Sequence, residues 1–256
     1  PNNLCGIFNY NLFMTKDIKL AVLIDGDNIP AKYIKEMMEE ITKYGTPTIK
    51  RIYGDWTNPY LSKWKGVLLE NAITPIQQYG YTTGKNATDS AMIIDAMDIL
   101  YSDKVDGFCL VSSDSDFTKL ATRLREAGMQ VYGIGEKKTP NPFIVACDKF
   151  IYLEILHQDE EVEEKGTKRK KKREVDKITP QVMRQLKNSV ADSADEDGWA
   201  FMGDVGKLIL KKQANFDPRN FGFEKLTPLF ASLKPFEIDA RVQAGGKIKV
   251  IYVKNK

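Results

Sequence analysis

The sequence predicts an α/β protein with a doubly wound, mostly parallel sheet, followed by a second, small winged-helix domain of the α+β class. Helix-like segments alternate with six short apolar runs, which lie near residues 20–25, 48–53, 73–79, 107–112, 129–134 and 149–156. The first of these runs lacks the apolar–polar alternation of a half-exposed strand, as expected when helices cover both faces of a parallel sheet. After a charged stretch, three further helix-like segments and a hairpin pattern form a separate unit.

The first apolar run is the clearest predicted strand. It ends abruptly at Asp25, and Gly26 allows the backbone to turn. Pro30 suits the first turn of a helix, and the apolar stripe of that helix ends near Gly45. The second strand also ends in an acid, Asp55. A short helix over about 59–70 and the third strand follow.

The rest of the first unit repeats this alternation. Thr88 can cap a helix with an apolar face that extends to about residue 100. The strand at 107–112 leads into a Ser/Asp loop and a helix that stops at Gly128. A fifth strand, a brief helical turn and a sixth strand complete a series of βαβ units, which predicts a mostly parallel sheet.

The composition changes after residue 156. An acidic block over 159–164 precedes a basic block over 165–173 that holds seven Lys or Arg residues. We expect a solvated linker over 157–176 that lets the flanking domains act separately, with phosphate contact by its basic half as the alternative. The predicted organisation has four parts: a disordered N-terminal extension over 1–17, an α/β domain over 18–156, this linker and a second domain over 177–256.

The second domain begins at Thr179 and Pro180, a capping residue followed by proline at the first helical position. A second short helix is expected around 205–209. A third is expected over about 223–233, where Pro228 predicts a kink. Two strand-like runs on either side of a Gly-Gly pair predict a β-hairpin. Three helices followed by a hairpin are typical of a winged helix.

Composition limits the possible chemistry. The only histidine, His157, lies beside the charged linker, so Ser-His-Asp and Cys-His catalysis have no base. The three cysteines form no CxxC pair, which favours a reducing compartment, and we expect a cytoplasmic protein. No apolar run approaches the roughly 20 residues of a membrane span, so no membrane partner is expected. If the protein is an enzyme, carboxylates must carry the reaction.

Acidic residues stand at the boundaries of the predicted elements. Asp25 ends the first strand, Asp89 opens a helix, and Asp114 and Asp116 follow the fourth strand. The carboxyl ends of the strands in open α/β sheets form ligand sites. Carboxylate oxygens are the ligands that Mg²⁺ or Mn²⁺ prefers, and such ions can act on a phosphodiester. We therefore expect Asp25, Asp89 and Asp114 to bind metal, with Asp116 and Asp27 as outer contacts or ligands of a second metal.

Other polar residues nearby are candidates for supporting roles. Asp27 and Asp55 are expected to support the metal-binding acids from further out. The candidates for substrate contact are Asn28, Lys85, Ser112 and Ser113.

Most of these candidates also have ordinary structural explanations. Asp89 could occupy the first turn of a helix because the helix dipole favours an acid there. Asp116 or Ser115 could cap the next helix, Asp55 could stabilise a turn, and Lys85 could simply be solvated. A structural role for Asp25 is hard to find, because a carboxylate at the end of a buried strand is costly unless it is compensated.

Three segments of the first domain resemble the NYN domain, a branch of the PIN-like metal-dependent ribonucleases that includes the bacterial LabA-type proteins. They are Leu-Ile-Asp-Gly-Asp-Asn at 23–28, Lys-Asn-Ala-Thr-Asp at 85–89 and Val-Ser-Ser-Asp-Ser-Asp-Phe at 111–117. The resemblance spans about residues 20–156. It implies a PIN-like sheet, with Asp25, Asp89 and Asp114 as the metal-binding acids and Asp116 as a further acid. Ser90 stands where some members of the family have a second Asp.

Residues 177–254 resemble the LOTUS or OST-HTH domain, through segments 198–200, 205–210 and 217–223. This resemblance implies a winged helix that binds RNA or a protein partner. A basic face for phosphates is one expectation, and an ordinary solvated face is the alternative. The residues of the expected basic face are Arg184, Lys187, Lys207, Lys211, Lys212 and Arg219.

The main hypothesis is a metal-dependent ribonuclease whose winged helix holds RNA or a partner. One alternative is a haloacid-dehalogenase-like phosphatase, in which Asp25 is the nucleophile and Asp27 the acid. Another is an RNA-binding adaptor that keeps the fold without catalysis. The sequence leaves the RNA target, endo- or exonuclease action and the oligomeric state open.

Overall fold

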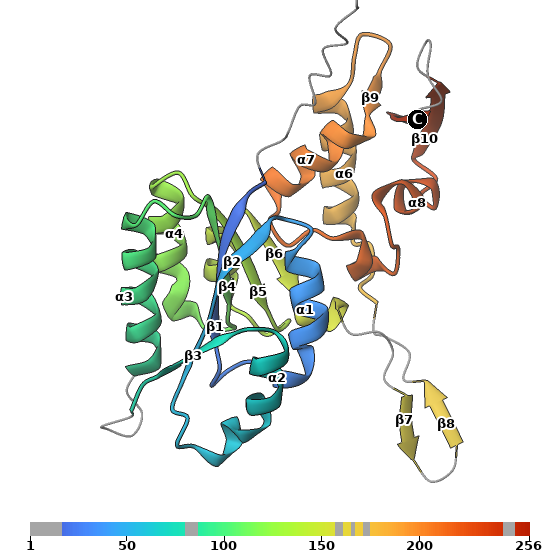
Figure 1. Cartoon of the computed structure of the whole chain (residues 1–256). Helices are drawn as coiled ribbons and strands as arrows, with labels where there is room; N and C mark the ends of the chain where they lie inside the picture. The colour runs from blue at the N-terminus through green and yellow to red at the C-terminus, as the bar shows by residue number, and fades with distance from the viewer. Residues whose placement is uncertain (1–16, 80–86, 157–160, 165–166, 171–174, 243–248) are drawn as a thin grey trace, which may run out of the picture.

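The computed structural model describes residues 17–79, 87–156, 161–164, 167–170, 175–242 and 249–256 (Figure 1). The first domain is built on a sheet of six strands in the order β3-β2-β1-β4-β5-β6, and every neighbouring pair is parallel. This confirms the predicted parallel sheet. The strands are β1 (Lys19–Asp25), β2 (Thr46–Gly54), β3 (Thr74–Gln77), β4 (Gly107–Val111), β5 (Gln130–Gly135) and β6 (Lys149–Tyr152).

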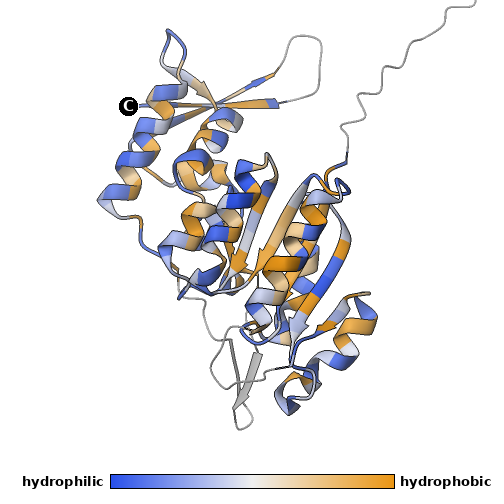
Figure 2. Cartoon of the chain, turned by 90° about the vertical axis from the view of Figure 1, so that its left-hand side faces the viewer, coloured by the Kyte–Doolittle hydropathy of each residue, from blue (hydrophilic) through white to orange (hydrophobic). Residues whose placement is uncertain are grey.

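Helices cover both faces of this sheet, and β1 contributes to both cores. Leu20, Val22 and Ile24 face α1 (Ile34–Ile41) and α2 (Trp64–Glu70). Ala21 and Leu23 face the other layer, which comprises α3 (Ala87–Tyr101), α4 (Thr118–Glu126) and α5 (Asn141–Ala146). Figure 2 shows hydrophobic residues concentrated along the strands between these layers. The continuous apolar run of β1 therefore reflects burial on both faces.

Short 3-10 segments precede three of these helices. They are η1 (Ala31–Tyr33), η2 (Pro59–Lys63) and η3 (Ser115–Phe117). The predicted sixth strand is shorter than expected, because the chain turns into η4 (Leu153–Ile155) after β6. Thr88 is not a cap, since α3 begins at Ala87.

Two short strands pair within the charged segment. β7 (Glu161–Glu164) pairs antiparallel with β8 (Thr167–Lys170). The register sets Glu161 opposite Lys170 and Glu163 opposite Lys168.

The C-terminal domain has the predicted winged-helix elements. Its sheet is antiparallel, in the order β10-β11-β9. Pro228 causes no kink, because it lies in the first turn of a short helix, where its missing N–H needs no partner. The elements are α6 (Pro180–Ser193), β9 (Trp199–Phe201), α7 (Met202–Lys212), η5 (Pro218–Phe221), α8 (Leu226–Ala231), β10 (Phe236–Val242) and β11 (Lys249–Asn255).

The two domains pack against each other at the sheet end opposite the carboxyl ends of the strands (Figure 1). The backbone N–H of Phe150 in β6 donates to the carbonyl of Ala214, at 2.9 Å. The amide of Asn215 donates to the hydroxyl of Tyr152, at 2.7 Å. These contacts join the edge strand of the sheet to the loop after α7. The two domains are therefore in contact, and their separate action stays a prediction.

A buried ion pair reinforces this contact. The two terminal nitrogens of the Arg219 guanidinium group, Nη1 and Nη2, donate to Glu40 at the end of α1, at 2.8 and 2.7 Å. Burial would raise the pKa of Glu40, but hydrogen bonds from Arg219 and Lys43 outweigh it and lower the pKa to about 2. Arg219 also pairs with Asp217. The expected phosphate contact by Arg219 is therefore wrong, because its guanidinium group is engaged inside the protein.

No helix within the described ranges combines the length and apolar character needed to cross a bilayer.

Candidate active site

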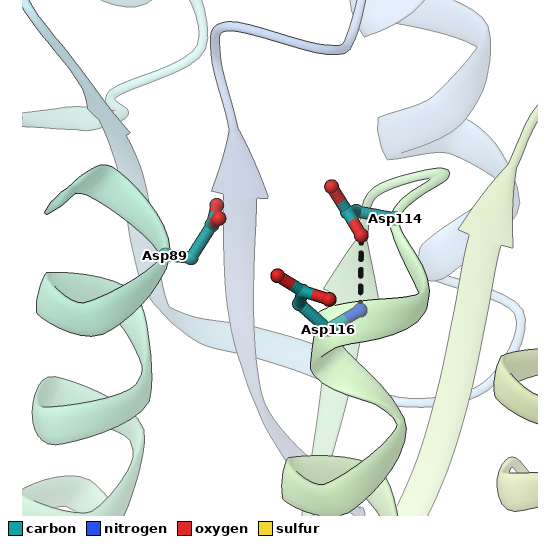
Figure 3. Close-up of side chains that lie close together, drawn as sticks. All are labelled: Asp89, Asp114 and Asp116. Atoms are coloured by element: carbon teal, nitrogen blue, oxygen red, sulfur yellow. Dashed lines mark hydrogen bonds between the residues drawn. The ribbon is translucent and has the colours of Figure 1, made fainter. Parts of the chain in front are cut away.

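Acidic side chains from three segments meet at the carboxyl end of the sheet (Figure 3). Asp89 comes from the first turn of α3, and Asp114 and Asp116 come from the loop and 3-10 turn after β4. One carboxylate oxygen from each of the three lies within 4.8 Å of the others. We call these three residues the carboxylate cluster. The structure thus brings Asp116 into the group, together with two of the three predicted metal ligands.

Local hydrogen bonding explains how the chain after β4 presents two acids. Asp114 is the N-cap of η3, and its Oδ1 accepts from the backbone N–H of Asp116, at 2.9 Å. The capping residue is thus Asp114, where Asp116 or Ser115 was expected. The cap fixes the turn so that the Asp116 carboxylate faces Asp89 and Asp114 (Figure 3).

Asp25 lies at the end of β1 and is only 1% exposed. Its Oδ2 accepts from the Asn28 amide at 2.7 Å and from the Ser112 hydroxyl at 2.8 Å. Its Oδ1 is buried without a hydrogen-bond partner among the described residues. Burial raises the pKa of Asp25, although the two hydrogen bonds oppose this shift. An orphaned, buried carboxylate oxygen is costly, and a cation would satisfy it.

Two serines next to the site form hydrogen bonds inside the protein. Ser112 is fully buried; its hydroxyl donates to Asp25 and accepts from the backbone N–H of Asp114, at 3.0 Å. Ser113 is 9% exposed and accepts from the backbone N–H of Glu136, at 2.9 Å. Both hydroxyls are already used inside the protein, and substrate contact by these serines stays a prediction. Ser112 ties Asp25 to the carboxylate cluster.

The other predicted site residues have different contacts. Asp27 accepts from the hydroxyl of Thr88 at 2.9 Å, which links the loop after β1 to the start of α3. Asn28 is exposed and orients Asp25, so substrate contact by Asn28 stays a prediction. The Asp55 carboxylate accepts hydrogen bonds from the Thr57 hydroxyl, at 2.6 Å, and from the side-chain amide of Gln77, at 2.9 Å. We therefore assign Asp55 to its turn. Lys85 lies outside the described residues.

The electrostatics of the site suit a cation. The pKa of Asp89 is raised to about 6, first by burial and then by the negative charges of Asp25, Asp114, Asp116 and Asp27. A divalent cation would relieve this repulsion. All the available donors are hard carboxylate oxygens, which suit Mg²⁺ or Mn²⁺. Together with the orphaned Oδ1 of Asp25, these donors fit a bound divalent cation.

Sequence reasoning missed one buried acid entirely. Glu40 lies on the apolar stripe of α1, three residues after Met37 and next to Ile41. A charged residue on a buried face signals a partner elsewhere in the fold, but the sequence does not identify Arg219 as that partner.

Comparisons with known proteins identify both domains. The NYN domain family matches residues 19–154, and the OST-HTH/LOTUS domain family matches residues 174–248. An uncharacterized protein of Methanocaldococcus jannaschii is 27% identical over 121 residues, which cover 46% of this chain and 47% of that protein. The chain thus spans about half the length of the curated relative it matches.

Two solved structures are also similar to the chain. A crystal structure of a protein of unknown function from Vibrio parahaemolyticus is 20% identical, with a TM-score of 0.44; the match covers 52% of this chain and 91% of that one. A solution NMR structure of an uncharacterized protein from Nitrosomonas europaea is 25% identical, with a TM-score of 0.30. That match covers 39% of this chain and 91% of the other. Their descriptions name no activity, so the function has to be argued from the site.

Proposed function

Because the chain belongs to the NYN-domain family of PIN-like nucleases, we propose that it is a ribonuclease that hydrolyses RNA phosphodiesters with a divalent cation. The observation that carries the proposal is the carboxylate cluster. Three carboxylate oxygens lie within 4.8 Å of one another, next to Asp25, whose buried Oδ1 has no hydrogen-bond partner in the described part of the chain. The LOTUS domain supports RNA as the substrate class.

The residues of the site would divide the work. Asp89, Asp114 and Asp116 would hold the cation, with Asp25 approaching from β1. When bound, Mg²⁺ or Mn²⁺ supplies Lewis-acid stabilisation of the negative charge that develops on the phosphate. Asn28 and Ser112 keep the Asp25 carboxylate oriented through their hydrogen bonds. Asp116 is the exposed member of the cluster and is the candidate to accept a proton from the attacking water.

The C-terminal domain would supply affinity for RNA or a partner. It packs at the opposite end of the sheet, so it does not border the carboxylate cluster (Figure 1). Some of its predicted basic face is already paired: Lys207 with Asp204 at 3.3 Å, and Lys212 with Asp192 at 2.5 Å. Exposed pairs of this kind are weak enough to exchange for phosphate contacts.

The site favours one of the two alternatives, the RNA-binding adaptor, over the other, the phosphatase. A phosphatase nucleophile must reach the substrate phosphorus, and the 1% exposure of Asp25 argues against that role. An RNA-binding adaptor remains the second candidate, because Ser90 replaces the second acid found in some family members.

Cleavage of a labelled single-stranded RNA tests the proposal. We expect cleavage in Mg²⁺ or Mn²⁺, none in EDTA, and none with Asp114→Asn. The matched control is Asp98→Asn, which removes an exposed carboxylate from α3, the helix that carries Asp89. RNA binding without cleavage in either metal would favour the adaptor. Equal cleavage by Asp114→Asn and the wild-type protein would refute the assigned site.

A further inference from the structure

A groove of about 570 Å³ lies between the loop after β1 and the η2–α2 segment. This volume is typical of sites that bind a small molecule or one unit of a polymer. Asp27 and Asn28 line the groove and also contact the site: Asn28 donates to Asp25, and Asp27 accepts from Thr88, the neighbour of Asp89. The groove therefore opens directly next to the proposed catalytic site.

The groove has an apolar floor and an aromatic rim. Ile29, Leu61 and Trp64 line it, and each is at most 5% exposed. Tyr60 also lines it, in η2, but is 87% exposed. An exposed ring does not contribute the hydrophobic stabilisation that the same ring would give if it were buried. An exposed ring beside an apolar floor offers the flat surface on which a nucleobase stacks.

Two cations complete the groove. Lys32 and Lys63 both line it and are exposed. The nearby carboxylate cluster repels phosphate in the absence of metal, whereas two lysines attract it. The groove thus combines an apolar floor, an exposed aromatic ring and two cations. A nucleotide combines a phosphate with a flat, largely apolar base, so the groove is complementary to one.

We propose that this groove binds one unpaired nucleotide of single-stranded RNA, next to the phosphate that is cleaved. Its base stacks on Tyr60, and Lys32 and Lys63 contact the backbone phosphates. This inference rests on the proposed function, because it places the adjacent phosphate at the carboxylate cluster. A base can enter the groove only when it is unstacked, so the substrate is single-stranded at this position.

A second groove borders the carboxylate cluster. It has a volume of about 540 Å³ and is lined by two acids of the cluster, Asp89 and Asp116, and by the exposed Lys119. The cation at Lys119 would attract phosphate groups of the same RNA strand.

Binding of a short, labelled single-stranded RNA to the full-length protein in EDTA measures this contact without cleavage. Tyr60→Ala should weaken binding by about 5- to 100-fold, the range expected for loss of one base–aromatic stack. Tyr60→Phe keeps the ring and should bind like the wild-type protein. Lys63→Ala should weaken binding and lower the salt dependence by about 0.7 in the logarithmic slope. Lys65→Ala is the matched control, because Lys65 is an exposed cation two residues away that does not line the groove.

The outcomes separate this inference from the proposed function. If the wild-type protein cleaves RNA and Tyr60→Ala has the same affinity for RNA and the same KM, the groove does not bind the nucleotide. The proposed nuclease activity would then still stand. Tyr60-dependent binding without metal-dependent cleavage would uphold the groove and refute the nuclease. If duplex RNA bound as tightly, with the same dependence on Tyr60, the single-stranded specificity would be overturned. An unchanged Tm of Tyr60→Ala, expected for an exposed side chain, shows that the variant is folded.

Discussion

Removal of the Arg219 guanidinium group should destabilise the contact between the two domains. The Glu40 side chain is 3% exposed and Arg219 is 22% exposed, so the ion pair is shielded from water. Arg219→Met keeps an unbranched apolar stem and removes both bonds to Glu40. Glu40 then retains Lys43, at 2.7 Å, and the hydroxyl of Tyr44, at 2.9 Å.

The magnitude follows from the pKa of Glu40. Burial opposes ionisation, but hydrogen bonds from Arg219, Lys43 and Tyr44 lower the pKa from its ordinary 4.5 to about 2. One pKa unit corresponds to 1.36 kcal/mol, so the folded protein favours the ionised over the protonated Glu40 by about 3 kcal/mol more than the unfolded chain does. All three hydrogen-bond partners contribute to this difference. Breaking a buried pair by removing one partner costs about 3–5 kcal/mol. Because Lys43 and Tyr44 remain as partners of Glu40, we expect Arg219→Met to lower the free energy of unfolding by about 3 kcal/mol at neutral pH.

The pH dependence has a defined direction. A lowered pKa in the folded state means that this stabilisation is present above the ordinary pKa of Glu40 and is lost as the pH falls. The destabilisation by Arg219→Met should therefore be complete at neutral pH and decrease between pH 4.5 and about 2.

A double-mutant cycle in urea denaturation of the full-length protein measures this interaction. It compares the wild-type protein with Glu40→Gln, Arg219→Met and the double variant. The matched control is the pair of Asp204 and Lys207, whose side chains are 61% and 75% exposed. That exposed pair should show a coupling energy of less than about 1 kcal/mol. If the coupling between Glu40 and Arg219 were equally small, or unchanged at pH 3, the account of the interface would be refuted.

Other predictions concern the site itself. Ser112→Ala should lower RNA cleavage by about 10- to 100-fold, because Asp25 loses the hydrogen bond that orients it, as in other sites where a partner of a metal ligand is lost. The matched control is Ser113→Ala. Equal cleavage by the two variants would contradict this prediction. Millimolar Mn²⁺ should raise the Tm of the wild-type protein but not that of Asp114→Asn, in thermal unfolding monitored by circular dichroism. Residues 17–156 alone should cleave short RNA, although with a lower Tm because Glu40 loses Arg219. A folded fragment without cleavage would show that the C-terminal domain takes part in the reaction.

Much of the fold could be predicted because its signals are local. The unbroken apolar run of β1 requires burial on both faces, and the structure supplies it with a helix layer on each side. The exception was the charged segment, where the pairing of β7 with β8 depends on register between two blocks. Composition alone suggested solvation, since it does not report which residues face each other.

The site was partly predictable for the same reason. Acids at the ends of parallel strands must gather at one edge of the sheet, so Asp25 and Asp114 could be located from the sequence. The direction of a side chain after a strand ends is not encoded locally. Ser112 and Ser113 therefore seemed available to substrate, although both hydroxyls turn inward. Arg219 is similar, because its partner lies 179 residues away in the chain.

A crystal soaked in Mn²⁺ tests the central claim most directly, through anomalous diffraction. The account predicts a peak within coordination distance of Asp89, Asp114 and Asp116, with the unpartnered Oδ1 of Asp25 facing the same ion or a second one. Mn²⁺ is a suitable probe because carboxylate oxygens bind it as they bind Mg²⁺. A fully soaked crystal with no peak between these carboxylates, or with its strongest peak elsewhere on the protein, would contradict the proposed metal site and the reaction built on it.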